Sequence, residues 1–429
     1  MSHDVVKTDK MSWVLDPNEE MLGPLKDGGT IIALTSPGCW GPMITPDFAS
    51  GHETTKPIYV EGAEVGDAVA LYIQEIKILA KATVSGIDEG VDGFYNGDPF
   101  VAPRCPVCDV VNPKTYLEGF GEKSIRCAKC HNPVTPFRLK SGYTMVFDDQ
   151  QEVGITVGKE ACLDIAKNAY AYAHLPEESK QYPANLYAKS DLEGVITRMR
   201  PMIGNMGSCP STRIPSSHNA GDFGAFLVGA PHEYGIDEKL LLKHKTDGHM
   251  DADEVRKGAI LIVPVKVKGA GIYIADVHAM QGDGEIAGHT TDVSAEVTLK
   301  VEVIKGLKMD GPILLPNAED LPFLARPYNQ RILDKARALA KEFNTTLMDD
   351  VYPMQVIGTG ANMDAAVNSG LQRMADLLGE SVDVVRNRVT ISGSVSISRM
   401  PGVAQITALV PASRLRELKI EHLYKGMYR

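Results

Sequence analysis

Alternating apolar and polar residues predict several β-strands in this chain. Residues 295–304 (AEVTLKVEVI) alternate at every second position, as expected for a strand with one buried face. Residues 57–78 form an apolar run, a glycine-containing turn and a second alternating segment. Two more apolar runs, 258–267 and 271–280, predict buried strands. The first hundred residues and the centre of the chain are therefore expected to be rich in β-structure.

Helical spacing of apolar residues appears in three other segments. These are residues 161–174, 328–343 and 363–379, the last of which ends at Gly379, a plausible C-cap. The two segments that follow, 385–399 and 402–411, are predicted to close the chain as strands. Between the first two helical segments, residues 195–215 indicate short strands and loops.

Composition and charge argue against several classes of protein, namely helical bundles, nucleic-acid-binding proteins and membrane-spanning proteins. The 429 residues include 40 glycines and 26 prolines, which suits turns and short strands better than a helical bundle. The net charge is −11 and no basic stripe occurs, so no nucleic-acid partner is expected. No run approaches 18 apolar residues, and the N-terminal residues lack the apolar centre of a signal peptide. We expect a cytoplasmic protein with no membrane span.

Four of the seven cysteines form two C-x-x-C pairs separated by 18 residues. The pairs are Cys105 with Cys108 and Cys127 with Cys130. Four thiolates satisfy tetrahedral Zn²⁺ and leave no open position, so this spacing predicts a structural zinc that helps the segment to fold. A redox pair and a coincidental grouping are the alternatives. His131 could replace one cysteine as a ligand, although a solvated histidine beside the site is the expected arrangement.

The expected fold class is α+β and β-dominated, with sandwich-like or barrel-like sheets, a C-terminal α/β portion and a small zinc-ribbon insert. The predicted parts are a β-rich N-terminal part (1–98), the zinc-ribbon-like insert (99–142), a central β domain carrying the active site (143–310) and a C-terminal α/β part (311–429).

Histidines and acids concentrate between residues 247 and 292. Asp276 and His278 are two positions apart on a predicted strand, so both side chains point to one face. The Gln-Gly-Asp-Gly sequence 281–284 predicts a turn that would return Glu285 beside His278, with His289 on the same face. Such groups are costly on an apolar sheet face unless they are paired or bind a metal. The alternative is a surface hairpin with solvated acids.

A second group, His249 and Asp251, precedes the predicted strand 258–267 and has the same spacing of two residues. These two side chains are also candidates for the site. Asp253 and Glu254 continue the acidic run and are predicted to be ordinary surface acids. Asp283, which lies in the turn itself, is predicted to be structural.

These residues resemble the acetamidase/formamidase family. That family carries a run close to G-D-x-H-x-x-Q-G-D-G-E, which residues 275–285 follow from Ala275 to Glu285. Its G-N-M-D segment is similar to residues 248–251, and its G-P-I-Y-V-E-G-A-E-P-G-D run is similar to residues 57–67. Further similar stretches are RPMIGNMG (200–207), MDAAVNSGLQRMADLL (363–378) and SGSVSISRMPGV (392–403).

The resemblance implies hydrolysis of the C–N bond of a small carboxamide, with release of ammonia and a carboxylic acid. Such chemistry suits a divalent metal, expected to be zinc, which activates water and polarises a carbonyl. The predicted metal ligands are Asp251, His278, His249 and His289. The predicted catalytic residues are Glu285, as general base and proton shuttle, and Asp276, which would orient His278 or bind the metal. Gln281 is predicted to contact the substrate.

Two departures from the family pattern add imidazole groups. His249 replaces an asparagine and His289 replaces a threonine, which favours zinc over calcium. Residues 208–246 have no counterpart in the pattern and are candidates for lining the substrate pocket; their histidines, His218 and His232, are expected to be loop residues rather than ligands. A larger or cyclic amide is therefore an alternative substrate, and a non-catalytic metal-stabilised scaffold is an alternative function. A homodimer or higher homo-oligomer is expected, because exposed sheet edges need cover.

Overall fold

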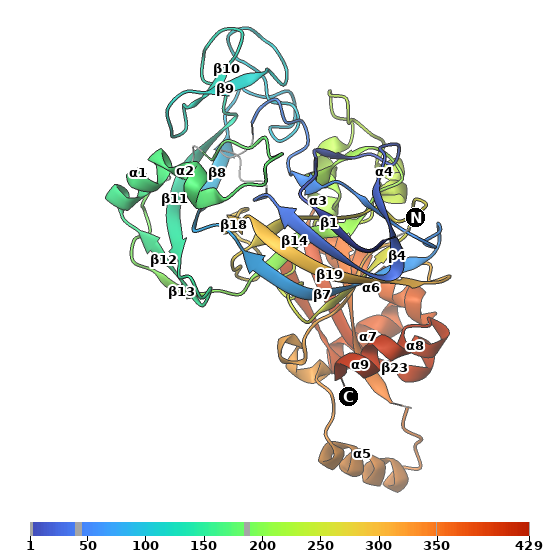
Figure 1. The fold of residues 1–429 in the computed structure, drawn as a ribbon. Coiled ribbons are helices and arrows are strands. Elements are labelled where there is room, and N and C mark those ends of the chain that lie inside the picture. The colour runs from blue at the N-terminus through green and yellow to red at the C-terminus, as the bar shows by residue number, and fades with distance from the viewer. Residues whose placement is uncertain (1–2, 39–44, 184–188, 349, 429) are drawn as a thin grey trace.

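The computed structural model describes residues 3–38, 45–183, 189–348 and 350–428. Within these residues, one thirteen-stranded sheet unites the N-terminal, central and C-terminal parts of the chain (Figure 1). All neighbouring strands in it are antiparallel except β1–β4 and β4–β6. From edge to edge the strands are β14 (Met202–Ser208), β17 (Ile272–His278), β6 (Ile58–Val60), β4 (Leu22–Thr35), β19 (Ala295–Ile304), β7 (Ala68–Ile78), β16 (Ile260–Pro264), β20 (Ile313–Leu315), β21 (Val351–Thr359), β23 (Val403–Pro411) and β22 (Ser394–Arg399), with β1 (His3–Thr8) beside β4 and β18 (Asp292–Val293) beside β17.

Both faces of this sheet are buried at its centre. In β7, Val69 and Leu71 join one apolar core, whereas Ala68 and Ala70 join a second core on the opposite face. This follows from the strand period of two, which sends successive side chains to opposite faces. All five residues of β16 are buried, which explains why its sequence is a continuous apolar run rather than an alternating one.

The two apolar cores lie in parts of the molecule that differ in secondary structure. The first lies among the N-terminal and central strands, and the second lies under a C-terminal layer of helices. This arrangement confirms the predicted β-dominated α+β class with a C-terminal α/β portion. The helices of the C-terminal layer are α6 (Met363–Leu378), α7 (Val382–Ser392), α8 (Ala412–Glu417) and α9 (Glu421–Tyr428). None of the described helices is both long and apolar enough to cross a membrane.

A four-stranded sheet stands beside the main sheet and carries the cysteine-rich segment (Figure 1). Its strands, in order, are β13 (Ile196–Arg198), β12 (Val153–Val157), β11 (Phe137–Phe147) and β8 (Ala82–Gly90). Two short helices, α1 (Lys159–Lys167) and α2 (Ala169–Ala173), bury Ile165 and Ala169 against this sheet. They occupy the segment 161–174 that was predicted as a single helix, and Asn168 separates them.

Shorter elements complete the described chain. They are β2 (Met11–Ser12), β3 (Val14–Leu15), β5 (Thr54–Thr55), β9 (Thr115–Leu117), β10 (Ile125–Cys127), β15 (Ile214–Pro215), α3 (Gly221–Gly224), α4 (Glu238–His244), α5 (Gln330–Glu342) and the 3₁₀ turns η2 (Ser216–His218), η3 (Ala225–Leu227), η4 (Ala318–Asp320) and η5 (Phe323–Ala325). The predicted helices 328–343 and 363–379 correspond to α5 and α6, and Gly379 caps α6 in the left-handed conformation.

One predicted strand was wrong over half of its length. Residues 385–399 were expected to be extended, but α7 occupies the segment up to Ser392 and the strand begins at Ser394. The Ser381 side chain accepts a hydrogen bond from Val384 N and so caps the helix. Val385 and Val389, four residues apart, then face the core. The β-branched residues suggested a strand, but the cap and the burial of one helical face decide the conformation.

A buried polar network joins the C-terminal layer to the central strands. The Asp247 carboxylate pairs with the ammonium group of Lys245 and with the guanidinium group of Arg373 on α6. It also accepts a hydrogen bond of 2.7 Å from Thr359 Oγ1 on β21. Asp247 is fully buried, and Lys245 nearly so. These contacts fix the segment that leads directly to His249 and Asp251.

We expect Asp247→Ala to lower the free energy of unfolding by about 3–5 kcal/mol, because it leaves the Lys245 charge buried without its partner. Urea unfolding monitored by circular dichroism measures the loss. Asp376→Ala on α6 is the matched control, since this exposed acid accepts a hydrogen bond from Gln372 and has no ion pair with another described residue. The control should change stability by less than about 1 kcal/mol. Equal losses in both variants would contradict the buried pairing.

Candidate functional site

The site is organised around Asp276, near the end of strand β17. As the strand period predicted, Asp276 and His278 share a face, and His278 Nε2 lies 3.1 Å from Asp276 Oδ1. Asp276 has a φ of +58°, and the pairing with β14 skips Gly204 at this point. A side chain at Gly204 would meet the carboxylates of Asp251 and Asp276. The glycine therefore leaves room for two buried acids to approach the same place.

The segment that follows Asp247 brings His249 and Asp251 to the same place. His249 Nε2 lies 3.1 Å from Asp251 Oδ2 and 3.5 Å from Asp276 Oδ2. All three side chains are almost completely buried. The structure thus unites the two groups of residues that the sequence placed in separate segments.

Hydrogen bonds orient both imidazoles toward the carboxylates. His249 Nδ1 donates to the Ser217 carbonyl at 2.6 Å, and His278 Nδ1 donates to Gln281 Oε1 at 2.9 Å. These bonds leave each Nε2 facing an acid, the orientation that metal-binding histidines adopt. Gln281, predicted to contact the substrate, holds its own position through the backbone carbonyls of Asp251 and Ser398.

His52 is a member of the site that the sequence analysis missed. Its Nε2 lies 3.8 Å from Asp276 Oδ2, and its Nδ1 lies 2.9 Å from Asn205 Nδ2. Complete burial lowers the pKa of His52 to about 3, so its ring is neutral and able to act as a ligand. The surrounding sequence, Ser50-Gly-His52-Glu53, shows no periodicity or spacing that would have distinguished this histidine.

These side chains form two groups of possible metal ligands that share one residue. His52, His249 and Asp276 make one group, and Asp251, Asp276 and His278 make the other; within each group the ligand atoms lie within 4.8 Å of one another. Imidazole nitrogens with carboxylate oxygens suit zinc and similar divalent ions.

Unpaired polar atoms support the same conclusion. Among the described residues, the buried atoms that lack a hydrogen-bond partner include His52 Nε2, Asp251 Oδ1, Asp276 Oδ1 and both carboxylate oxygens of Asp292. His278 Nε2 faces two of these five atoms, Asp276 Oδ1 and Asp292 Oδ1, and burial of so many acceptor atoms is costly unless a cation compensates them. The residues present therefore fit a divalent metal.

The chain reverses after β17, but the predicted hairpin was wrong in its register. The tight return at Gly282–Gly284 was expected to place Glu285 beside His278 on a new strand. Instead, residues 279–291 form an irregular loop, and only β18 pairs with β17, which puts Asp292 opposite His278. His278 Nε2 lies 3.3 Å from Asp292 Oδ1. The acid that the hairpin brings to the histidine is therefore Asp292.

Glu285 still reaches the site from this loop. Burial, together with the carboxylate of Asp251, holds its pKa well above the usual range, although His278 and Arg399 act in the opposite direction. Asp292 behaves similarly: burial and the Asp276 carboxylate raise its pKa to about 7. At neutral pH these two groups are able to carry protons, which ordinary surface acids are not.

His289 lies outside the two groups of ligands. Its Nε2 contacts Asp88 Oδ2 at 2.9 Å, on strand β8 of the smaller sheet. The same strand donates a hydrogen bond of 2.6 Å from Thr83 Oγ1 to the Asp292 carbonyl. The smaller sheet thus contacts both the loop that carries Glu285 and the strand β18 that carries Asp292.

Arg399 brings the C-terminal layer into the site. Its guanidinium group makes two hydrogen bonds to Asp222, of 2.6 and 2.9 Å, and also pairs with Asp251. The side chain is only 1% exposed and lies over the ring of Phe223. Asp222 and Phe223 belong to α3, so part of residues 208–246, the candidates for lining the substrate pocket, contacts the site. Arg399 stood within the quoted stretch SGSVSISRMPGV, but nothing in its spacing indicated a buried charge.

The backbone is unusual at the acids of the site. Asp251, Asp276 and Glu285 have φ values of +47°, +58° and +40°, in the left-handed region. Non-glycine residues seldom occupy this region, and such conformations concentrate at functional sites because the surrounding structure must hold them.

The four cysteines of the insert converge as predicted. Cys105 Sγ lies 3.3 Å from Cys130 Sγ, and Cys108 Sγ lies 3.7 Å from Cys127 Sγ. Tetrahedral zinc with bonds of about 2.3 Å requires sulfur separations of about 3.8 Å, so the cluster fits this ion. His131 Nδ1 instead lies 3.0 Å from the Tyr116 hydroxyl. The four cysteines support the predicted zinc-ribbon-like insert.

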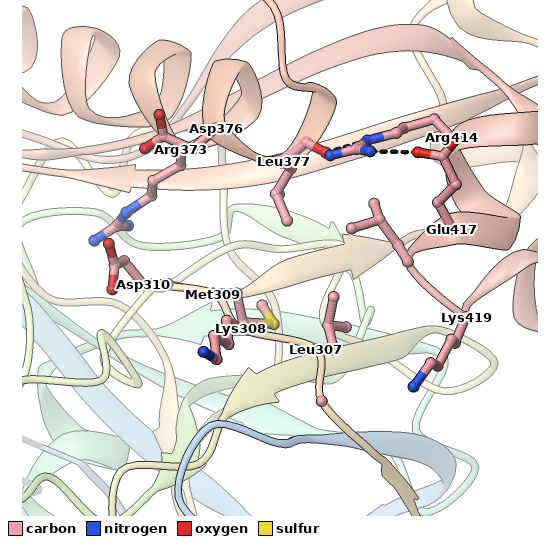
Figure 2. A pocket seen from close by; sticks show the side chains of 13 residues that line it. Leu307, Lys308, Met309, Asp310, Arg373, Asp376, Leu377, Arg414, Glu417 and Lys419 are labelled. Carbon is pink, nitrogen blue, oxygen red and sulfur yellow. Dashed lines mark hydrogen bonds and ion pairs between the residues drawn. The ribbon is translucent and has the colours of Figure 1, made fainter.

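A cavity of about 360 Å³ lies elsewhere, between the loop after β19 and helices α6 and α8 (Figure 2). None of the residues that line it belongs to the cluster around Asp276. Two of its cations are already paired: Arg373 with Asp247, and Arg414 with Glu417 and the Leu377 carbonyl. The cavity therefore lacks the concentrated chemistry of the buried cluster.

Comparison with known proteins identifies the family. The model of the acetamidase/formamidase family matches residues 39–244 and 239–413, which is most of the chain. The chain belongs to this family. A Schizosaccharomyces pombe protein named "Putative formamidase" is 25% identical over 292 residues, which cover 66% of this chain. The chain spans about 60% of the length of that relative.

Solved structures share the fold of this acetamidase/formamidase family member. A "predicted acetamidase/formamidase" from Thermoanaerobacter tengcongensis superposes with a TM-score of 0.54 and 17% identity, covering 97% of this chain and 98% of that one. An acetamidase from Bacillus halodurans gives a TM-score of 0.52 and 17% identity, with 99% of both chains covered. At this level of identity the likeness concerns the fold alone.

Gly38→Ala is a direct test of the crowding at Asp276, since the added methyl group would overlap Asp276 Oδ1. We expect this variant to displace the carboxylate and to lose the metal of this cluster, so that elemental analysis of the purified protein finds about one metal ion per chain fewer than in the wild type, while the zinc of the four cysteines remains. Gly426→Ala, where the added methyl group meets open space, is the control and should retain its metal. Wild-type metal content in Gly38→Ala would contradict the role of Asp276.

Proposed function

We propose that this chain is a metal-dependent amidohydrolase that cleaves the C–N bond of a small linear carboxamide, giving ammonia and a carboxylic acid. Membership of the acetamidase/formamidase family supports the reaction class. The observation that carries the mechanism is the buried meeting of two oriented imidazoles and several carboxylates around Asp276. Amide hydrolysis needs an activated water, a polarised carbonyl and a proton for the departing amine, and this cluster suits all three requirements.

The proposed ligands are His52, His249, Asp251, Asp276 and His278, with zinc as the expected ion. A divalent ion bound there would lower the pKa of a water ligand to roughly 7 and polarise the amide carbonyl. Asp276 belongs to both of these ligand groups, so loss of its carboxylate would affect an ion bound in either of them. His289, which the sequence placed among the ligands, is left out of the set because Asp88 engages it.

Glu285 is the proposed general base and acid. Its raised pKa allows the carboxylate to accept a proton from water and return it to the amide nitrogen as the C–N bond breaks. Asp292, whose pKa is about 7, is the nearest alternative carrier of that proton.

The remaining residues of the site position these groups. Gln281 holds the His278 ring through Nδ1, and Arg399 holds Asp251 from the opposite side. Burial of the whole cluster keeps bulk water away, which strengthens each of these electrostatic contacts.

The second proposed metal is a structural zinc held by Cys105, Cys108, Cys127 and Cys130. Their thiolates fill all four positions of a tetrahedral ion, so no position is left for a substrate. We assign this zinc to folding of the insert, residues 99–142. A cytoplasmic location and a homo-oligomeric state are further proposals, which rest on composition and on exposed sheet edges.

Ammonia release from a panel of amides tests the reaction. We expect hydrolysis of at least one small linear amide, such as formamide, acetamide or propionamide, in preference to a lactam. Glu285→Gln should lower kcat by about 100-fold or more, the usual contribution of a general acid or base. His278→Ala should lower both activity and bound metal, because it removes a ligand.

Asp283→Asn is the matched control for Glu285→Gln, since Asp283 lies in the same loop but outside the two ligand groups. Its activity should stay within about twofold of the wild-type value. Full activity in both Glu285→Gln and His278→Ala would rule out this site, and a lactam as the preferred substrate would exclude the linear amide.

Replacing Cys105 and Cys127 by serine tests the two metal sites separately. We expect the double variant to lose one zinc per chain and to melt at a lower temperature, while metal at the Asp276 cluster and amidase activity remain. Elemental analysis and thermal unfolding measure both effects. Loss of all metal with the cysteines would favour a scaffold whose metal is structural alone.

A further inference from the structure

Asp98 and His218 form a buried pair that belongs to neither group of proposed metal ligands. His218 Nε2 lies 2.7 Å from Asp98 Oδ2, and neither side chain is exposed to solvent. The rings of Phe223, Phe100 and Phe226 surround His218, with centroids 5.9, 6.3 and 6.4 Å from its own. A pair in such an apolar setting adds little net stability, because desolvation offsets the attraction. Stability alone therefore does not account for it.

The pair is oriented at both ends by hydrogen bonds. Asp98 Oδ1 accepts a bond of 3.0 Å from Phe100 N, which leaves Oδ2 directed at His218. A carboxylate can only accept, so His218 Nε2 carries the proton that it donates. Nδ1 of the neutral ring is then an acceptor, and Ser217 Oγ donates to it at 2.8 Å.

Ser217 connects this pair to the metal cluster. Its carbonyl accepts a hydrogen bond of 2.6 Å from His249 Nδ1, and His249 Nε2 faces the carboxylates of Asp251 and Asp276. In metal-binding histidines, such a bond at the second ring nitrogen fixes the tautomer and the direction of the ring. The turn that carries Ser217 and His218, η2, therefore determines where His249 points.

Turn η2 also contacts the segment that carries His52. Ser216 Oγ donates a hydrogen bond of 2.7 Å to the His52 carbonyl, and His52 N lies 3.3 Å from the same Oγ. Gly51 has a φ of +83°, and a side chain there would begin 1.9 Å from Ser217 Oγ. Glycine thus allows this segment to lie directly against the turn. Two of the proposed ligands depend on the position of η2.

Serine, histidine and aspartate also form the nucleophilic triad of many hydrolases, but this arrangement does not present a nucleophile. Ser217 is completely buried, and its Oγ lies 3.2 Å from the Ser50 carbonyl as well as beside His218. A nucleophilic hydroxyl group must face the substrate. The geometry therefore suits a residue that holds the turn rather than one that attacks an amide.

We propose that Asp98 and His218 are positioning residues of the metal site, which fix turn η2 so that the Ser217 carbonyl holds the His249 ring toward the ion. This inference rests on the proposed function, in which His249 is a metal ligand. Loss of a group that orients a ligand typically weakens metal binding by about 10- to 100-fold. Because Asp98 acts through His218, the effects of losing the two should not add.

Chelator competition against the cobalt-loaded, full-length chain tests the proposal. Cobalt on cysteine ligands absorbs intensely in the near ultraviolet, whereas cobalt on histidine and carboxylate ligands gives weak visible bands, so one experiment measures both sites. We expect Asp98→Asn and His218→Gln each to weaken cobalt binding at the Asp276 cluster by about 10- to 100-fold and to shift its visible bands. The double variant should bind no more weakly than the weaker single variant. Unchanged cysteine bands show that the insert remains folded.

His232→Gln is the matched control. His232 Nε2 lies 3.9 Å from the same Asp98 oxygen, but its Nδ1 accepts a hydrogen bond from Tyr234 N rather than from η2. Its cobalt affinity should stay within about twofold of the wild-type value. Ser217→Ala is a milder variant that keeps Asp98 and His218 and removes only the hydroxyl group between the turn and the ring. It should weaken cobalt binding by about fivefold, the contribution of one hydrogen bond.

Wild-type cobalt affinity in both Asp98→Asn and His218→Gln, additive losses in the double variant, or equal weakening by His232→Gln would each overturn the proposal. If neither variant of the pair folds, wild-type affinity in Ser217→Ala overturns it. Ammonia release separates this result from the amidase function. Unchanged affinities in a chain that hydrolyses amides would end the positioning role alone, and weakened affinities in a chain that hydrolyses none would support positioning and end the amidase.

Discussion

The burial of several like charges at one point is the constraint on which this structure depends. Asp276 cannot stand beside Asp251 and Asp292 in a dry interior unless cationic groups lie between them. Imidazole rings, the Arg399 guanidinium and a proposed divalent ion supply that compensation from different directions. The left-handed backbone at the acids shows that the surrounding sheets enforce their approach, because isolated chains avoid this conformation.

Different parts of the fold hold the buried acids close to one another. The strand β17 carries Asp276, the smaller sheet fixes the loop after it, and the C-terminal layer inserts Arg399. The network around Asp247 ties the C-terminal layer to the segment that carries His249. The site is therefore built by residues from the main sheet, the smaller sheet and the C-terminal layer together, rather than by a single loop.

Local patterns in the sequence predicted much of this arrangement. Alternating apolar residues predicted strands such as 295–304. The C-x-x-C spacing predicted that the four cysteines would lie together, as the structure shows. The proximity of Asp276 and His278 followed from the strand period alone. The sequence did not predict which residue would pair with His278 on the next strand. An irregular loop of thirteen residues separates β17 from β18, and the length of such a loop fixes no pairing register.

Contacts between segments that lie far apart in the sequence could not be predicted from local patterns of residues. His52 and Arg399 are separated by most of the chain, and neither stands in a repeating or charged motif. Their burial arises from packing of whole sheets, which local sequence does not encode in any simple period. Helix α7 shows the same limit at smaller scale, since capping by Ser381 outweighed the preference of its β-branched residues for strands.

Arg399 follows all the other charged residues of the site in the sequence, which affects the order in which the site can form. A nascent chain that has emerged as far as β19 already contains His52, His249, Asp251 and Asp276, but lacks the guanidinium group that balances them. Until β22 has paired with β23, these acids lack one of the cations that compensate them in the interior. Closure of the site therefore requires the strands that follow β19 in the sequence.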